Sequence, residues 1–412
     1  MATSGPFSHV VEVRGHIIDS LILPRILDEL MDLGCDFAIE SLDVGKHKTD
    51  PSHARIEILA PSQERLARAL TAVQVHGAMP IAIDDAELGV CPSDGVLPDG
   101  FYSTTNLDTL IRLEGSWVEV DHPEMDCVIR VDDDQAECAP AYDLRAGDKV
   151  VVGHKGIRIV PLERSRRPSA LFGFMGSTIS SEKPRSLAIK ESGVWIKQAR
   201  REGGKIAVVA GPAIVHTDSR EYLCRLIRAG YVDVLLAGNA LAAHDIEASL
   251  LGTSLGVPLA GGQPPDTGHE HHLRAINTIR AAGSIAKAVE TGILTDGIMF
   301  ECVKNDVKFV LAGSIRDDGP LPDVITDVLE AQKAMRECAR DNVKVALMLS
   351  TMLHSIAMGN LLPAHVHTVS VDINPAALTK LVDRGSFQSI GLVMDVGGFL
   401  RELLDELGAN TD

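Results

Sequence analysis

The residues best suited to chemistry follow five apolar segments in the second half of the chain. Each segment is rich in Val, Leu, Ile or Ala and ends in small, polar or acidic residues. The carboxyl ends of parallel strands share one edge of a sheet, and ligands bind beyond that edge. We therefore expect one site that contains Gly238, Asn239 and Ala240; Ser314, Arg316, Asp317 and Asp318; Ser350, Thr351 and His354; Asp372 and Asn374; and Asp395, Gly397 and Gly398.

This pattern is typical of a dinucleotide site, and its details favour a nicotinamide cofactor. The segment STMLHS (350–355) can open a helix whose backbone N–H groups would meet a pyrophosphate. Asp372 can accept a hydrogen bond from an adenosine ribose, which favours NAD over NADP. The alternative role of Asp372 is a helix cap before Pro375. No GxGxxG follows any of the apolar segments, so the standard fingerprint is absent.

A second set of candidates lies in GGQPPDTGHEHHLRAIN (261–277), where His269, Glu270, His271 and His272 are adjacent. The zinc motif HExxH fails because position 273 is Leu, and no nearby cysteine completes a structural zinc site. We therefore expect no metal. A polar loop that handles substrate or protons is the functional interpretation, and an exposed turn before a helix is the alternative.

The elements that must position these residues alternate between strand and helix over residues 191–412. The apolar runs are nearly continuous, as in parallel strands covered on both faces. They predict a doubly wound α/β domain. The predicted strands are KIAVVAGPA, VDVLLAGNA, GIMFECVKN, VKFVLAGS, VKVALMLST, HTVSVDIN and IGLVMDVGG, with Cys302 at the end of the third.

The first half of the chain has a different order of predicted strands and helices. Residues 1–95 follow the order strand, helix, strand, strand, helix, strand, which predicts a ferredoxin-like α+β domain. Residues 96–165 hold short strand signals separated by Asp, Gly and Pro, which predicts a small β-rich domain. Residues 166–190 are expected to be a connector, and residues 191–412 the NAD-binding Rossmann-like domain.

Bulk composition narrows the class of protein. The 412 residues carry a formal charge of −18, which argues against a nucleic-acid partner. Seven scattered cysteines without a CxxC pair do not form a disulfide framework, so we expect a reducing cytoplasm. The N-terminus lacks an apolar signal region, and no apolar run is long enough to span a membrane.

Six strings together resemble one family. They are FYSTTN (101–106), GPAIVHT (211–217), LLAGNALAAHDIE (235–247), GHEHHL (268–273), ECVKN (301–305) and VLAGSIRDDGPLPDV (310–324). The chain resembles the archaeal-type ornithine cyclodeaminases, also labelled the LOR/SDH conserved region. It is similar to the C-terminal module of cyanobacterial arginine dihydrolase/ornithine cyclodeaminases. The dihydrolase module of those fusions is not evident, so arginine hydrolysis is not expected.

The resemblance implies conversion of L-ornithine to L-proline and ammonia. NAD would stay bound and be recycled through hydride abstraction, ring closure, ammonia loss and hydride return. It also implies a nucleotide domain similar to that of deoxyhypusine synthase, which would explain the missing glycine motif. By motif match the cofactor positions would be Asn239, Ala240, Asp317 or Asp318, Ser350, Thr351, Met352, Leu353, Asp372, Met394 and Asp395; Asn374 joins them from its place after an apolar segment.

The chemistry needs carboxylates for a diamine and a group that moves protons near neutrality. We assign Glu270, His271 and Asp317 to those tasks, although the family pattern identifies no catalytic base. A homo-oligomer is also expected. The alternatives are an NAD-dependent dehydrogenase of saccharopine or proline type, a non-catalytic sensor of NAD and amino acids, and a transferase that would need a nucleophilic lysine such as Lys304.

Overall fold

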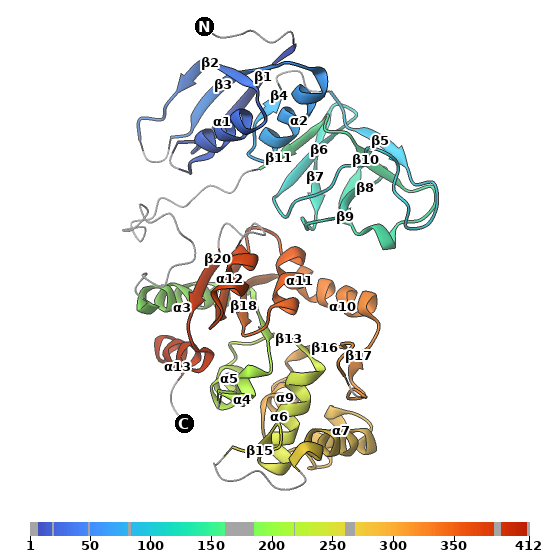
Figure 1. The fold of residues 1–412 in the computed structure, drawn as a ribbon, viewed down its shortest axis with the longest axis vertical. Coiled ribbons are helices and arrows are strands. Elements are labelled where there is room, and N and C mark those ends of the chain that lie inside the picture. Colours follow the sequence, from blue (N-terminus) through green and yellow to red (C-terminus); the bar gives the residue numbers. More distant parts are fainter. Residues whose placement is uncertain are drawn as a thin grey trace. The chain divides into compact units, whose positions relative to one another are not determined.

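A computed structural model describes residues 7–18, 20–47, 50–80, 84–160, 185–217, 219–259, 268–317, 319–382 and 389–409. The chain divides into two compact units, Met1–Gly176 and Ser177–Asp412, which are drawn in Figure 1. No helix among these residues is long and apolar enough to cross a membrane.

The first unit begins with the predicted ferredoxin-like domain. Its elements are β1 (Phe7–Gly15), α1 (Ile22–Asp32), β2 (Asp36–Asp43), β3 (Ser52–Ala60), α2 (Gln63–Gln74) and β4 (Met79–Pro80). The strands pair antiparallel in the order β2-β3-β1-β4, which is the expected topology. Alternate residues of β3 are buried, and they pack with Leu30 of α1 and Leu66 of α2.

The same unit holds a second sheet of short strands, as the β-rich segment predicts. They are β5 (Glu87–Val90), β6 (Thr109–Leu113), β7 (Ser116–Asp121), β8 (Val128–Asp132), β9 (Gln135–Ala139), β10 (Lys149–Val152) and β11 (Ile157–Ile159), with a 3-10 turn at Ala141–Asp143. Their order is β11-β6-β7-β9-β8-β10-β5. Because β5 pairs with β10, this sheet begins before residue 95. The domain limits at residues 95, 165 and 190 stay predictions.

The second unit is an α/β domain whose parallel sheet has seven strands among the described residues. They are β12 (Lys205–Ala210), β13 (Val234–Gly238), β16 (Lys308–Ala312), β17 (Val324–Ile325), β18 (Val343–Leu349), β19 (His367–Asp372) and β20 (Ser389–Val393). The order β17-β16-β13-β12-β18-β19-β20 is the doubly wound arrangement, extended at one edge by β17. The chain moves outward from β12 in one direction and returns to its other side at β18, so the strand order reverses between these two strands.

Helices and short pairings connect the strands of this unit. They are α3 (Arg185–Arg201), α4 (Ala213–His216), α5 (Arg220–Arg228), α6 (Asn239–Leu251), β14 (Thr253–Ser254), β15 (Val257–Pro258), a 3-10 turn at Gly268–Glu270, α7 (His271–Ala282), α8 (Ile285–Glu290), α9 (Ile298–Lys304), α10 (Val328–Arg340), α11 (Leu353–Leu361), α12 (Pro375–Val382) and α13 (Val396–Leu407). Alternate residues of β12 enter two separate apolar cores, Val208 in one and Val209 in the other. Both faces of the sheet are therefore covered, which accounts for its continuous apolar strands.

One predicted strand is wrong. GIMFECVKN contains α9, and Cys302 is buried in the core rather than placed at a strand end. The helix begins where the Asp245 carboxylate accepts the N–H groups of Ile298 at 2.9 Å and Met299 at 2.8 Å. A short apolar run fits a buried helix as well as a buried strand, and this distant carboxylate decides between them.

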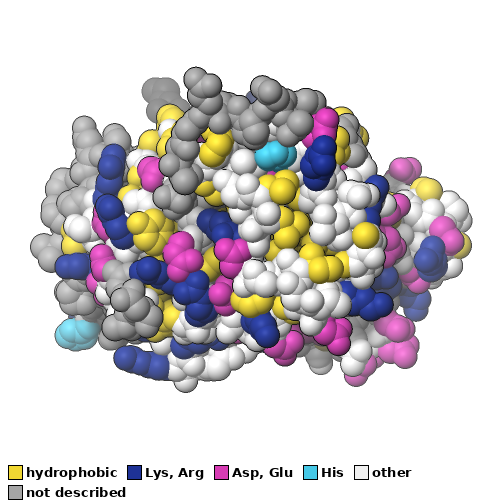
Figure 2. All heavy atoms as spheres, turned by 90° about the horizontal axis from the view of Figure 1, so that it is seen from below, with side chains coloured by type: hydrophobic (Ala, Val, Ile, Leu, Met, Phe, Trp, Pro, Cys, Tyr) yellow, Lys and Arg dark blue, Asp and Glu magenta, His cyan; other side chains and the backbone are white. Residues whose placement is uncertain are grey.

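Figure 2 shows one face of the molecule, on which basic and acidic side chains are interspersed rather than gathered by sign. All seven cysteines lie in the described residues, and each is a buried free thiol.

Candidate functional site

At the carboxyl edge of the parallel sheet, the backbone segments that follow β12 and β18 approach each other closely, at the point where the strand order reverses. Gly211 follows β12 and donates its N–H to Leu349 O of β18 at 2.9 Å. Ser350 has a left-handed φ of 50° and donates its N–H to Val371 O at 2.9 Å. A Cβ added to Gly211 would overlap the carbonyl oxygen of Ser350 and lie 3.1 Å from Thr351 Cβ. Such a close backbone approach requires glycine, and it occurs at the reversal of strand order, where doubly wound sheets bind their ligands.

His354 connects three of the predicted polar segments. It is the second residue of α11, and its Cε1 atom would lie 3.2 Å from a Cβ atom added to Gly238 at the end of β13. Burial lowers the pKa of His354, and the nearby Asp317 carboxylate opposes that shift. Asp317 itself accepts the N–H of Ser314 through Oδ2 at 2.8 Å. The loops after β13, β16 and β18 therefore converge, as the sequence predicts.

The next strand ends combine helix capping with exposed polar groups. Asp372 Oδ1 accepts the N–H of Asn374 at 2.8 Å, and Asn374 Oδ1 accepts the N–H of Ala376 at 3.0 Å in the first turn of α12. The cap of α12 is thus Asn374, and no described residue donates to the second oxygen of Asp372. Asp395 caps α13 through the N–H of Gly398 at 2.9 Å. Met394 is buried in the core.

The remaining predicted cofactor positions differ in exposure. Asn239 is buried, and its Oδ1 accepts the N–H of Leu321, which holds the loop that follows β16. Ala240 and Thr351 are half-buried, whereas Met352 and Leu353 are exposed. Asp318 lies outside the described residues.

A hydrogen-bonded histidine cluster lies in the elements that follow β12 and β13. We define it as His216, His244, Glu247, Thr253 and His271. Glu247 is fully buried, and its Oε2 is 2.9 Å from His244 Nδ1. Its Oε1 accepts the hydroxyl of Thr253 at 2.9 Å, and that hydroxyl is 2.7 Å from His271 Nδ1. One buried carboxylate therefore connects helices α6 and α7.

His216, the last residue of α4, completes the cluster. Its ring centroid is 4.8 Å from that of His244 with an interplanar angle of 64°, and its Nδ1 is 2.6 Å from Ser254 Oγ. The pKa of His216 is lowered, first by burial and then by the positive charge that His244 can carry, whereas Glu247 acts in the opposite direction. Burial thus favours the neutral imidazole, which can accept a proton.

Of the three predicted catalytic residues, His271 joins this cluster and Asp317 lies beside His354. Glu270 has a side chain 42% exposed and forms an ion pair with Arg274 at 2.7 Å. The carboxylate that contacts the histidines is instead Glu247, which was not among the predicted site residues. The available signal was the spacing of His244 and Glu247, three residues apart on one helix face, within LLAGNALAAHDIE.

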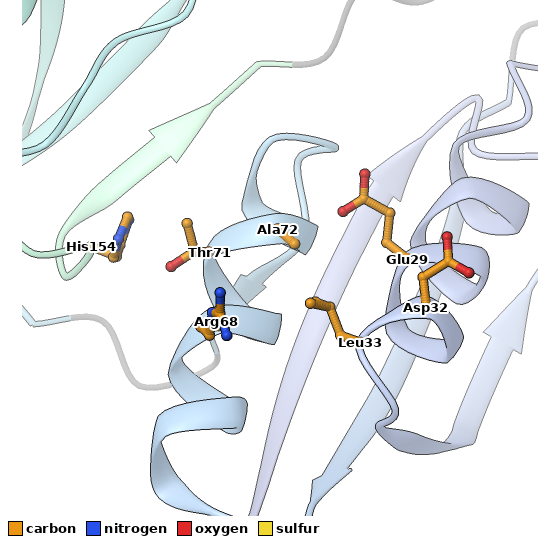
Figure 3. A pocket seen from close by; sticks show the side chains of 7 residues that line it. All are labelled: Glu29, Asp32, Leu33, Arg68, Thr71, Ala72 and His154. Atoms are coloured by element: carbon orange, nitrogen blue, oxygen red, sulfur yellow. The ribbon is translucent and has the colours of Figure 1, made fainter.

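Among the described residues, no group of three or more His, Cys, Asp or Glu side chains is arranged to hold a metal ion. A cavity of about 580 Å³ lies in the first unit and contains none of the predicted site residues. Figure 3 shows its lining, with Glu29, Asp32 and Leu33 near α1, Arg68, Thr71 and Ala72 on α2, and His154 on the side of α2 away from α1.

Three family models match the chain. Residues 191–403 match "Arginine dihydrolase ArgZ-like, C-terminal, Rossmann fold", residues 108–189 match the first region of the same C-terminal part, and residues 8–107 match the "LOR/SDH bifunctional enzyme conserved region". The ornithine cyclodeaminase of Methanothermobacter thermautotrophicus is 56% identical over 96% of this chain and 97% of its own length. The bifunctional arginine dihydrolase/ornithine cyclodeaminase AgrE of a Nostoc species is 44% identical over 97% of this chain and 58% of its own.

Solved structures agree with these matches. A crystal structure of ArgZ, a cyanobacterial arginine dihydrolase, is 39% identical over 98% of this chain and 58% of its own, with a TM-score of 0.85. A ternary complex of AgrE with ornithine and NAD+ is 42% identical over 98% of this chain and 58% of its own, with a TM-score of 0.52. The predicted likeness to deoxyhypusine synthase stays a prediction.

Proposed function

Because this chain belongs to the family of ornithine cyclodeaminases and ArgZ-like C-terminal regions, we propose that it converts L-ornithine to L-proline and ammonia with bound NAD. The observation that carries the proposal is the reversal of strand order between β12 and β18, where the backbone of Gly211 passes against that of Ser350. A relative that is similar over nearly the whole chain has been crystallised with ornithine and NAD+. A relative of this chain therefore binds the same substrate and the same cofactor that we propose here.

The residues of the carboxyl edge fit the cofactor. Gly211 and the start of α11 bring backbone close to the reversal of strand order, as a pyrophosphate requires. Asp372 keeps one carboxylate oxygen available for a ribose hydroxyl. Ile373, with 74% of its surface exposed, and Leu353, with 75%, lie at the same edge and offer apolar contact to an adenine. When bound, NAD would accept a hydride from the substrate and later return it, so no net redox change results.

The chain's own side chains must bind a diamine and move protons. Asp317 offers a carboxylate for an ammonium group, beside a His354 imidazole that burial favours as neutral. Closing the five-membered ring requires one amine to lose a proton, and releasing ammonia requires the other to gain one. The histidine cluster supplies groups for both transfers. Holding the two ends of one substrate close together also favours ring closure over reaction with water.

We place the enzyme in a reducing cytoplasm, supported by seven buried free thiols. The decisive experiment incubates the purified protein with ornithine, with and without NAD, and measures proline, ammonia and NADH. Proline and ammonia without accumulated NADH support cyclodeamination. Accumulation of NADH would instead identify a dehydrogenase, and tight NAD binding without turnover a sensor.

A further inference from the structure

We propose that Glu247 is a positioning residue that sets the tautomers of His244 and His271, so that the Nε2 atom of each accepts protons in the reaction. This inference rests on the proposed ornithine cyclodeaminase activity and specifies how its site transfers protons. It follows from the hydrogen bonds around one fully buried carboxylate.

Glu247 is held as an ionised acceptor. Its Oε2 faces His244 Nδ1, while its Oε1 accepts the Thr253 hydroxyl at 2.9 Å and the N–H of Gly256 at 2.8 Å. Burial opposes ionisation of Glu247, but the hydrogen bonds from His244, Gly256 and Thr253 outweigh it and lower the pKa of the carboxyl. An ionised carboxylate has no proton to donate, so its partners must supply one.

This requirement decides both tautomers. His244 Nδ1 must carry its proton to bond Glu247 Oε2, which leaves the lone pair of neutral His244 on Nε2. The Thr253 hydroxyl donates its single proton to Glu247, so it can only accept from His271 Nδ1. His271 therefore also carries its proton on Nδ1 and leaves Nε2 as the acceptor. A single carboxylate orients two imidazoles that lie 27 residues apart in sequence, as carboxylates orient histidines in many active sites.

Two acceptor nitrogens match the proton balance of ring closure. Once the substrate carbon is at the imine level, the remaining amine attacks it, forms the new C–N bond and loses a proton to an Nε2 atom. The nitrogen of the original imine then takes up a proton and leaves as ammonia when its C–N bond breaks. The proton removed in the first step equals the proton supplied in the second, so this part of the reaction needs no further oxidant or reductant. His244 keeps 12% of its side chain exposed, so the ring is not completely closed off from solvent.

The test uses Glu247→Gln, which preserves the shape of the side chain. A glutamine amide can donate to His244 Nδ1 and thereby favours the opposite tautomer. We expect kcat for proline formation to fall by roughly 10²-fold or more, with the acid limb of the pH–rate profile displaced. The Kd for NAD and the midpoint of thermal unfolding should stay close to those of the parent protein. Nitrogen-15 NMR should show the Nδ1–H form of His244 in the parent and the Nε2–H form in the variant.

Two further substitutions keep the test independent of folding problems in Glu247→Gln. Thr253→Val removes the hydroxyl that joins Glu247 to His271, leaves the direct contact between Glu247 and His244, and should lower kcat. Thr253→Ser keeps a hydroxyl and should retain the kcat of the parent protein. Glu301→Gln is the matched control, because Glu301 is a half-buried carboxylate that pairs with Arg228 at 2.9 Å away from the cluster. It should leave the pH–rate profile unchanged.

An unchanged kcat and pH–rate profile in Glu247→Gln would overturn the inference. So would equal losses of NAD affinity, thermal stability and kcat with unaltered histidine tautomers, since that pattern belongs to a structural carboxylate. If the parent protein made no proline from ornithine, the proposed function would fail instead. The NMR assignment of the two histidines would still decide whether Glu247 sets their tautomers.

Discussion

Gly211 lies so close to Ser350 that a Cβ atom added to the glycine would overlap the carbonyl oxygen of the serine. The two residues follow β12 and β18, the neighbouring strands at which the order of the sheet reverses. A side chain at residue 211 would therefore have to push the start of α11 away from β12. Because Thr351 and His354 are carried by that segment, the disturbance would reach the candidate site directly.

We expect Gly211→Ala to raise the Kd for NAD by about 10-fold or more, equivalent to about 1.4 kcal/mol. Isothermal titration of the protein with NAD measures this. The matched control is Gly359→Ala in α11, where an added Cβ meets no atom within 4 Å. That variant should bind NAD normally and gain up to about 1 kcal/mol in helix stability. Equal NAD affinity in both variants would contradict the placement of the cofactor.

Asp317→Asn should weaken ornithine binding while the fold stays intact. The asparagine can still accept the N–H of Ser314, but it removes the negative charge beside His354. The pKa of His354, already lowered by burial, should therefore fall further, which an NMR titration would detect. We expect KM for ornithine to rise about 10-fold, or about 1.4 kcal/mol. Asp306→Asn, at the opposite end of β16, is the control and should bind ornithine normally. If ornithine binding were unchanged in Asp317→Asn, Asp317 would be only an exposed residue of a turn and not part of the substrate site.

Asp372→Asn tests the choice between NAD and NADP. The variant keeps the hydrogen bond with the N–H of Asn374, so the turn before α12 should survive. Loss of the charge should weaken NAD binding by about 10-fold, or about 1.4 kcal/mol, and narrow the preference over NADP. Fluorescence titration with each nucleotide measures both effects. Asp148→Asn, whose Oδ2 accepts the N–H of Arg145 in the first unit, should change neither. A preserved NAD preference in Asp372→Asn would exclude contact with the ribose.

Asp245→Asn should destabilise the second unit by roughly 3–5 kcal/mol, because it leaves the Arg220 guanidinium without its buried counter-charge. Asp245 is fully buried, and its Oδ1 lies 2.6 Å from Arg220 Nε. Urea unfolding at neutral pH measures the decrease in the free energy of unfolding. Asp296→Asn removes the exposed partner of the same arginine, at 3.2 Å, and should cost at most about 1 kcal/mol. A similar loss in the free energy of unfolding for both variants would show that the buried ion pair stabilises the fold no more than the exposed one.

His367→Phe should reduce the loss of stability in acid. The imidazole stacks on Trp195 with centroids 4.3 Å apart, and burial lowers the pKa of His367 from its ordinary 6.5, followed by repulsion from His365. The unfolded chain then binds the proton more readily, so stability is present above pH 6.5 and is lost as the pH falls toward the lowered value. Phenylalanine keeps the stacking without titrating. The unfolding midpoint, measured at several pH values, should fall less steeply for the variant, and an identical slope would refute this.

The sequence by itself determined the three kinds of fold along the chain, ferredoxin-like, β-rich and doubly wound α/β, and the edge of the parallel sheet that carries the polar residues. Strands covered on both faces must be apolar along their whole length, and the chain can become polar only where it leaves the sheet. That is why Gly238, Asp317 and His354 could be grouped before the fold was known. The same logic failed at GIMFECVKN, because an apolar run alone does not separate a short buried helix from a strand.

Tertiary structure alone decided which carboxylate forms hydrogen bonds within the histidine cluster. Glu270 is adjacent to His271 in sequence, yet it pairs with Arg274 at the surface, whereas Glu247 reaches His271 through Thr253. Successive residues of a helix point in different directions, so sequence neighbours seldom share a partner. Which side chains meet depends on how α6, β14 and α7 pack, and burial then forces Glu247 to satisfy both of its oxygens with the groups that packing brings to it.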